Sequence, residues 1–183
     1  MALPFLDKKT YTITLNSEDR INFSSSNRNN CTFNLDWSQI LPREYDDYKV
    51  AFSFGTAGGY YKDTAGATVF SSAKIYVDFG SKSYNYDSSL KSQGTLLGIV
   101  YRDIQTTGST SNTLSCYYLY NPPKSITRPQ SNFITVKIIN QFTGTLLTNT
   151  DTSGAAVSDM TPWTMMIEFI AIEEPRKSLP NLL

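Results

Sequence analysis

The sequence predicts an all-β protein, an eight-stranded antiparallel sandwich. Apolar and polar residues alternate with a period of two in short segments from about residue 10 to residue 172. Side chains of a strand point alternately to opposite faces, so this spacing sends one set into a core and the other into water. No segment has the spacing of a helix. Eight such strands in 183 residues are typical of two antiparallel sheets packed face to face in one domain.

The first four predicted strands lie at about 10–15, 31–37, 48–54 and 73–79. Each has small or polar residues on one phase and apolar residues on the other. The apolar phases are Tyr11, Ile13 and Leu15; Cys31, Phe33, Leu35 and Trp37; Tyr48, Val50, Phe52 and Phe54; and Ile75, Val77 and Phe79. We therefore expect these residues to form the core, and Tyr76 to lie on the outward phase of the fourth strand.

The last four predicted strands lie at about 96–104, 114–120, 133–139 and 163–172. The fifth has the poorest alternation. The seventh and eighth have strict apolar phases, which are Ile134, Val136 and Ile138; and Trp163, Met165, Ile167 and Phe169. The opposite phase of the last strand is largely apolar too, so we expect that strand to be buried on both faces or central.

The connections alternate in character. The first, third, fifth and seventh are long and rich in Gly, Ser, Thr and Asn, whereas the second, fourth and sixth contain the stiffer sequences, such as 41–43 (LPR) and 121–123 (NPP). Alternate loops of a sandwich emerge at opposite ends, so we expect one polar end and one end stiffened by proline. Residues 10–172 would form the domain, with arms at 1–9 and 173–183.

The charge pattern argues against bulk nucleic-acid binding. Lys and Arg number 16, Asp and Glu number 16, and the basic residues are scattered instead of clustered on one face. Charged residues make up 17% of the chain, against an average of about 25% in soluble domains. Such a surface is typical of a subunit that neighbours cover. No apolar run approaches the ~20 residues of a membrane span.

Catalytic and metal-binding residues have little support. The chain has no histidine, which excludes His-based nucleophile arrangements and removes the commonest zinc ligand. Nucleotide-binding glycine motifs are absent. The main carboxylates lie at strand ends or on outward phases, where we expect them in solvent: Glu44, Asp46, Asp47, Glu168, Glu173 and Glu174. A calcium site at Asp151 and Asp159 lacks a compact ligand spacing. We expect no enzyme and no cofactor.

The two cysteines and the tyrosines are explained most simply by structural roles. Cys31 and Cys116 fall on apolar phases, so we expect two buried thiols without a disulfide. Three tyrosine groups could stack sugars, bind a protein partner or simply cover strands: Tyr60 and Tyr61; Tyr84 and Tyr86; and Tyr117 and Tyr118. Glycan binding is therefore weakly supported.

Several segments in order resemble one family. They are 12–20 (TITLNSEDR), 33–37 (FNLDW), 48–54 (YKVAFSF), 122–129 (PPKSITRP), a strand with Val136, and 163–172 (WTMMIEFIAI). This pattern is similar to the single jelly-roll capsid proteins of large double-stranded DNA viruses and virophages, namely penton and small minor capsid proteins. Together these segments cover most of the chain as an ordered pattern.

The resemblance implies a single jelly roll with sheets BIDG and CHEF, in which the last strand lies between the first and third. It also implies a structural protein of the virion that is made and assembled in the host cytoplasm or nucleus. The protein would be a penton that forms a homopentamer at the icosahedral vertices and contacts neighbouring capsid proteins. Another minor capsid role, or a non-viral carbohydrate-binding β-sandwich module, is the alternative.

The arms offer candidate subunit contacts. Both contain prolines, which resist helix and ladder pairing, together with apolar side chains that gain by leaving water. Such tails commonly fray, and in an assembly they would dock on a neighbour instead. The residues concerned are Leu3, Phe5, Leu6, Leu179, Leu182 and Leu183.

Overall fold

The expected all-β fold is confirmed. The computed structural model describes residues 9–22, 28–57, 72–80, 94–103, 113–116, 121–141, 144–147, 149–150, 156–157 and 160–172. Its strands are β1 (Thr10–Asn16), β2 (Asn30–Asn34), β3 (Asp47–Thr56), β4 (Ser72–Asp78), β5 (Thr95–Asp103), β6 (Thr113–Cys116), β7 (Lys124–Thr127), β8 (Phe133–Asn140), β9 (Asn149–Thr150), β10 (Ala156–Val157) and β11 (Trp163–Ala171). One short α-helix, α1 (Trp37–Ile40), and a 3₁₀ turn at Ser17–Asp19 complete it.

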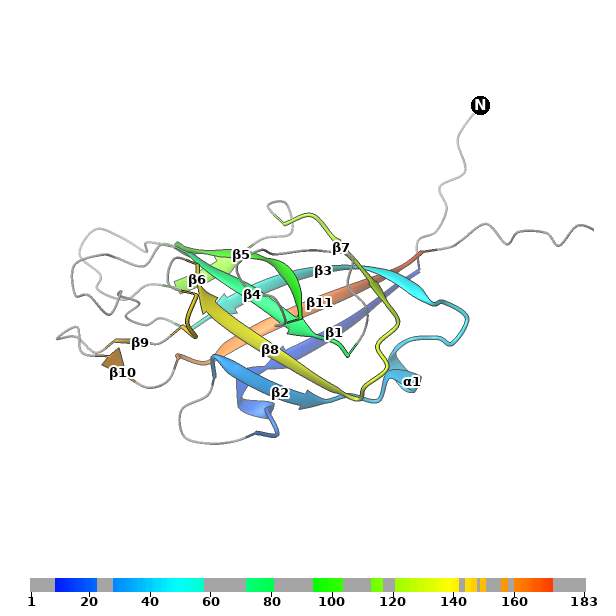
Figure 1. Cartoon of the computed structure of the whole chain (residues 1–183), viewed down its shortest axis with the longest axis horizontal. Coiled ribbons are helices and arrows are strands. Elements are labelled where there is room, and N and C mark those ends of the chain that lie inside the picture. Colours follow the sequence, from blue (N-terminus) through cyan, green and yellow to red (C-terminus); the bar gives the residue numbers. More distant parts are fainter. Residues whose placement is uncertain are drawn as a thin grey trace, which may run out of the picture.

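Eight of these strands form two four-stranded antiparallel sheets (Figure 1). The first sheet has the order β1-β11-β3-β6, and the second has the order β5-β4-β8-β2. Strands β5 and β6 also pair with each other, which joins the sheets along one side. This is the order of a single jelly roll, and β11 lies between β1 and β3 as expected. Figure 1 shows α1 and the β9–β10 hairpin at opposite ends of the sandwich.

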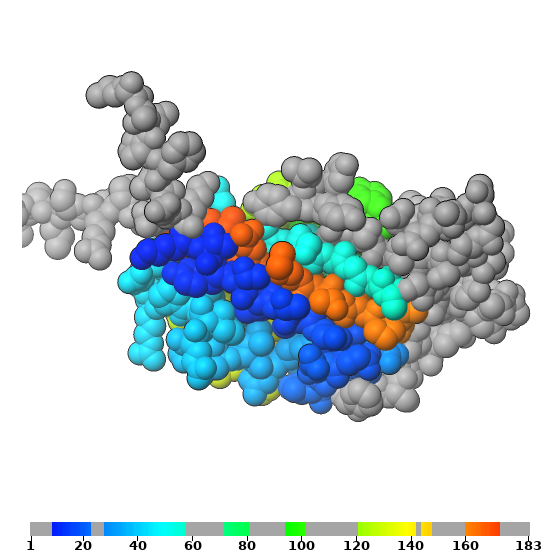
Figure 2. All heavy atoms as spheres, turned by 180° about the vertical axis from the view of Figure 1, so that it is seen from behind, coloured from blue at the N-terminus to red at the C-terminus, as the bar shows by residue number. Residues whose placement is uncertain are grey.

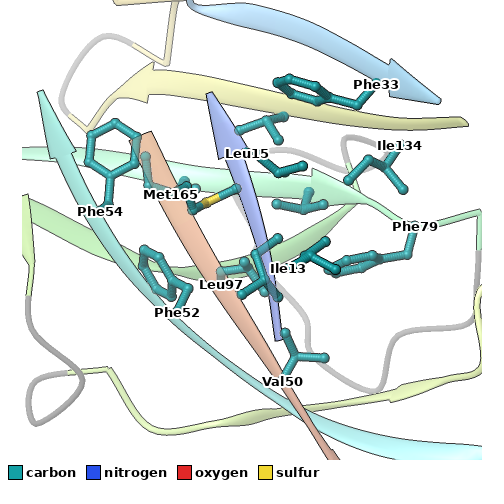
Figure 3. Packing of buried hydrophobic residues seen from close by; sticks show 14 of the residues in the cluster. Ile13, Leu15, Phe33, Val50, Phe52, Phe54, Phe79, Leu97, Ile134 and Met165 are labelled. Carbon is teal, nitrogen blue, oxygen red and sulfur yellow. The ribbon is translucent and has the colours of Figure 1, made fainter. Parts of the chain in front are cut away.

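The register turns one phase of every strand inward, because directly opposed residues share a face. Across the first sheet, Ile13 of β1, Ile167 of β11 and Phe52 of β3 lie in one row. All three belong to a single buried cluster with residues of the second sheet (Figure 3). Aromatic pairs join the sheets, with ring centroids 6.0 Å apart for Phe33 and Trp163. The predicted core phases of β3, β8 and β11 are therefore confirmed.

The second predicted strand was too long, and a short helix follows it within an almost purely β fold. Strand β2 ends at Asn34 because Asp36 starts α1 as its N-cap, with Oδ1 accepting a hydrogen bond from the Ser38 N–H at 3.0 Å. Trp37 stays in the core, where its ring lies 5.5 Å from that of Phe169. Trp37 therefore contributes its side chain to the core from α1 and not from a strand.

The proline-rich sixth connection is also partly a strand. Strand β7 pairs with β3 through Ile126 opposite Tyr48, on the same edge of β3 that β6 joins further along. Two of its prolines, Pro122 and Pro123, precede β7, where they leave its ladder intact. Of the predicted strand 114–120, the structure describes 114–116, within β6, and 117–120 lie outside the described residues.

One predicted face needs correction, and the structure decides between the two alternatives for the last strand. Tyr76 is buried, so β4 is buried on both faces and not half-exposed. The last strand is central, but its outward phase is open, since Met166 is 45% exposed. The mixed outward phase of β11 therefore reflects a surface and not a second core.

The poor alternation of β5 has a structural cause. The register with β4 shifts between Ile75 and Tyr76, which leaves Leu97 as an extra residue in a bulge. The Asn121 side chain bonds both backbone groups of the nearby Ile99, accepting from its N–H at 2.8 Å and donating to its carbonyl at 3.0 Å. A Cβ at Gly98 would collide with Asn121, so the close approach requires glycine there.

Candidate functional site

The outward face of β1, β11 and β3 is the candidate assembly surface (Figure 2). The register sets Thr12 beside Glu168 and Thr14 beside Met166, which in turn faces Ser53. The residues on the outward phases of the three strands are Thr10, Thr12, Thr14, Asn16, Lys49, Ala51, Ser53, Gly55, Thr164, Met166, Glu168 and Ile170. Ala51 is buried and Ser53, Gly55, Glu168 and Ile170 are half-buried, so the exposed part of the face lies mainly on β1 and on Lys49, Thr164 and Met166. Two of these twelve are charged, so most of the face can be covered by another protein without desolvating a charge.

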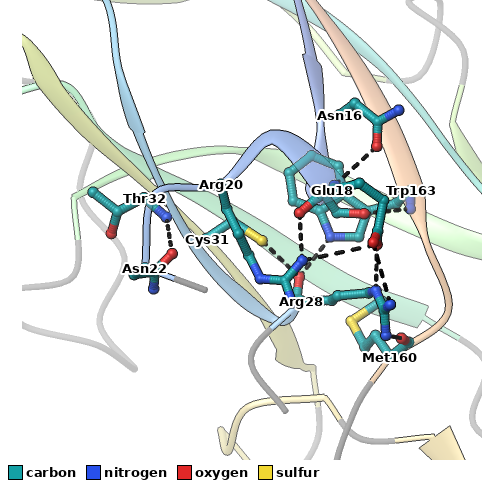
Figure 4. Close-up of polar contacts among 10 residues, drawn as sticks. Asn16, Glu18, Arg20, Asn22, Arg28, Cys31, Thr32, Met160 and Trp163 are labelled. Atoms are coloured by element: carbon teal, nitrogen blue, oxygen red, sulfur yellow. Dashed lines mark hydrogen bonds and ion pairs between the residues drawn. The ribbon is translucent and has the colours of Figure 1, made fainter. Parts of the chain in front are cut away.

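A hydrogen-bonded network fixes the turn between β1 and β2 (Figure 4). Glu18 bridges to the Arg28 guanidinium at 2.5 Å. The Arg28 backbone carbonyl accepts from the Trp163 indole N–H at 2.5 Å and from the Cys31 thiol at 3.3 Å. The hydrogen bond from Arg28 lowers the pKa of Glu18 below its ordinary range. The turn is therefore tied to β11 and β2 at once.

A buried arginine belongs to the same network. Arg20 is 4% exposed, and its guanidinium donates to the Ser17 carbonyl at 2.6 Å. It also lies 3.8 Å from the Glu18 carboxylate. Sequence reasoning missed this role, because a lone arginine in a polar connection normally lies in solvent. The burial of Arg20 depends on the 3₁₀ turn at Ser17–Asp19, which brings the Ser17 carbonyl within reach of the guanidinium. The alternation of apolar and polar residues does not predict that turn.

A second network closes the opposite end of the sandwich. The Arg128 guanidinium donates to the carbonyls of Leu41, at 2.7 Å, and of Pro42, just after α1. Arginine suits this place because helix carbonyls are left without partners at the C-terminus. The Tyr48 hydroxyl donates to Pro42 as well, at 3.2 Å, and burial raises the pKa of Tyr48. Both ends of the domain are thus braced by arginine.

The carboxylates in the described part of the chain do not converge on one cleft. Glu44 accepts from the Lys9 ammonium at 3.2 Å on the surface. Hydrogen bonds that the Lys9 ammonium donates to Tyr45 and Glu44 raise the pKa of Lys9. Glu168 lies on the outward face of β11, and no cluster of metal-ligating side chains occurs among the described residues. Glu173, Glu174, Asp151 and Asp159 lie outside that part.

The predicted arm contacts and tyrosine groups lie outside the described part of the chain, whereas both cysteines lie on described strands. The arm residues Leu3, Phe5, Leu6, Leu179, Leu182 and Leu183 lie outside the described residues, as do the tyrosines at 60, 61, 84, 86, 117 and 118. Cys31 is buried in β2, whereas Cys116 ends β6 in the other sheet. The absence of a disulfide between Cys31 and Cys116 remains a prediction.

Comparisons with protein-family models and with curated protein sequences give no match to this chain. Among the described residues, no helix is long and apolar enough to cross a membrane.

Proposed function

We propose that this chain is a structural subunit of a viral capsid, a penton protein that forms homopentamers at the vertices of a double-stranded DNA virus. The observation that carries the proposal is the strand order. Strands β1-β11-β3-β6 and β5-β4-β8-β2 correspond to BIDG and CHEF, the arrangement implied by the resemblance to capsid jelly rolls. Fold alone does not fix function, so the surface must support the same conclusion.

The surface supports an assembly role. The twelve outward residues of β1, β11 and β3 form a sheet face with many threonines and two charges. Covering such a face costs little desolvation, and Met166 at 45% exposure offers apolar area to a neighbour. The low fraction of charged residues in the whole chain likewise keeps the cost of desolvation small when a neighbour covers its surface.

The function is then geometric. In a ring of five copies every interface is heterologous, and it closes because each copy is rotated by one-fifth of a turn. The two arginine networks tie the connections to the strands at both ends of the domain, which favours one interface geometry in all five copies. The arms at 1–9 and 173–183 add contacts to other capsid proteins, each buried Leu or Phe contributing about 1.5–3 kcal/mol before ordering costs.

The experiment is electron microscopy of the purified protein, together with a glycan array. Five-fold rings without glycan binding support the proposal. A monomer that binds glycans would replace it with a carbohydrate-binding module. Particles in which the protein lies away from the vertices would assign another minor capsid role.

A further inference from the structure

The backbone of Thr32 in β2 points away from the sheet. Strand β2 is the terminal strand of the second sheet, and its Thr32 lies opposite Thr135 of β8. Bonded and non-bonded positions alternate in an antiparallel pair, and side chains come closest at the non-bonded positions. The hydroxyl oxygens of Thr32 and Thr135 lie 3.2 Å apart, as expected at a non-bonded position. The N–H and C=O groups of Thr32 are therefore directed towards the outer edge of β2.

Residues Ile21 and Asn22, on the chain that leads into β2, occupy this edge. The Ile21 N–H donates to the Thr32 carbonyl at 2.8 Å. The Asn22 Oδ1 accepts from the Thr32 N–H at 2.8 Å (Figure 4). The Asn22 Nδ2 donates to the Asn30 carbonyl, also at 2.8 Å. One side-chain amide thus makes the donor and acceptor contacts that a peptide group of a further strand would make.

The sequence of β2 explains why this contact is needed. Unpaired backbone groups of a terminal strand recruit strands of other chains, and sheets are protected by charged side chains, prolines or a covering segment. Strand β2, with the sequence NCTFN, has neither a charged residue nor a proline. Its protection at Thr32 therefore comes from the segment that covers it.

We propose that Asn22 is a guard residue, which keeps β2 from pairing with β2 of a second copy of this chain. The pairing that it prevents is isologous, because both copies would use the same edge. With the edge closed, copies of the chain do not join into one continuous sheet through β2. This inference goes beyond the proposed function, since it concerns each single chain, whether or not five copies form a ring.

Substitution of Asn22 tests the guard. Asn22→Ala removes both side-chain hydrogen bonds from the edge of β2. We expect this variant to form species larger than those of the wild type, in proportions that rise with protein concentration in sedimentation velocity. Asn22→Asp keeps an acceptor for the Thr32 N–H and adds a charge to the edge, so it should sediment as the wild type does.

The matched control is Asn29→Ala, the same change at a position whose side-chain hydrogen bond lies away from this edge. The Asn29 side chain is buried and donates to the Leu147 carbonyl at 2.7 Å. Its loss lowers stability, which urea unfolding measures, but we expect no new species. Equal association of Asn22→Ala and Asn29→Ala would show that lost stability, and not an opened edge, is the cause. An Asn22→Ala variant that sediments like the wild type would also overturn the proposal.

Amide hydrogen exchange tests the wild type directly. An amide on the outer side of a terminal strand exchanges quickly unless it is hydrogen-bonded. We expect the Thr32 amide to exchange about tenfold or more slowly in the wild type than in Asn22→Ala. A wild-type Thr32 amide that exchanges as fast as that of an unstructured peptide would contradict the guard role, whatever the variants do.

Discussion

At the scale of single residues, the Asn121 side chain makes the two hydrogen bonds to Ile99 that a neighbouring strand would otherwise make. Its amide bonds both backbone groups of Ile99 where the two sheets separate. Asn121→Ala leaves those groups without partners, so we expect a loss of about 1–3 kcal/mol in the free energy of unfolding. Urea unfolding measures it.

The control is Asn34→Ala, the same change at an exposed position of β2, which should cost less than about 0.5 kcal/mol. Equal losses in the two variants would show that the Asn121 bonds do not matter.

Glu18 makes stability depend on pH. Its pKa is lowered in the folded state by the hydrogen bond to Arg28. The carboxylate therefore stabilises the fold fully above its ordinary pKa of 4.5, and this contribution disappears as the pH falls through the lower folded value. We expect the difference in melting temperature between wild type and Glu18→Gln to be constant at neutral pH and to shrink in acid. A difference that grows in acid would refute this.

The cysteines give a prediction at the same scale. Strands β2 and β6 lie in different sheets, and Cys31 donates its thiol hydrogen to a backbone carbonyl. We expect two thiols per chain to react in denaturant without reductant. A colorimetric thiol assay that detects none would establish a disulfide.

At the scale of elements, the sequence identified strands with strict alternation and missed those set by local chemistry. The inward phases of β3, β8 and β11 follow directly from their spacing. The helix α1 has four residues, too few to show a periodicity, and its signal was the cap at Asp36. Strand β7 was masked by the prolines before it, which mark a turn without excluding a strand that starts after them.

The candidate surface was accessible to sequence reasoning in part. The alternation of β1 predicts its outward threonines, and the apolar outward phase of β11 is compatible both with a second buried face and with a central strand. Its exposure at Met166 depends on which segments cover the sheet, and alternation within one strand does not encode that. The buried Arg20 depends equally on the fold of its turn.

The C-terminal arm carries its own prediction. Residues 176–183 contain three leucines and follow the domain, so we expect their deletion to weaken assembly and to leave thermal unfolding of the monomer almost unchanged. Light scattering during assembly and calorimetry measure the two effects. A shorter chain that assembles normally, or melts much lower, would show that the arm is not an assembly element.

At the scale of the whole molecule, the domain has the features that we expect of a capsid subunit. Two sheets share one core, an arginine network ties the connections at each end, and the outward face of β1, β11 and β3 bears little charge. A single fixed arrangement suits a subunit of a ring, because the ring closes only when every copy repeats the same rotation.

Native mass spectrometry of the purified protein tests the assignment as a penton most directly, because it counts the copies in each assembly. We expect a species of five copies, or multiples of five, that persists on dilution. A protein that stays monomeric at every concentration, or closes with a different number of copies, would contradict the assignment as a penton.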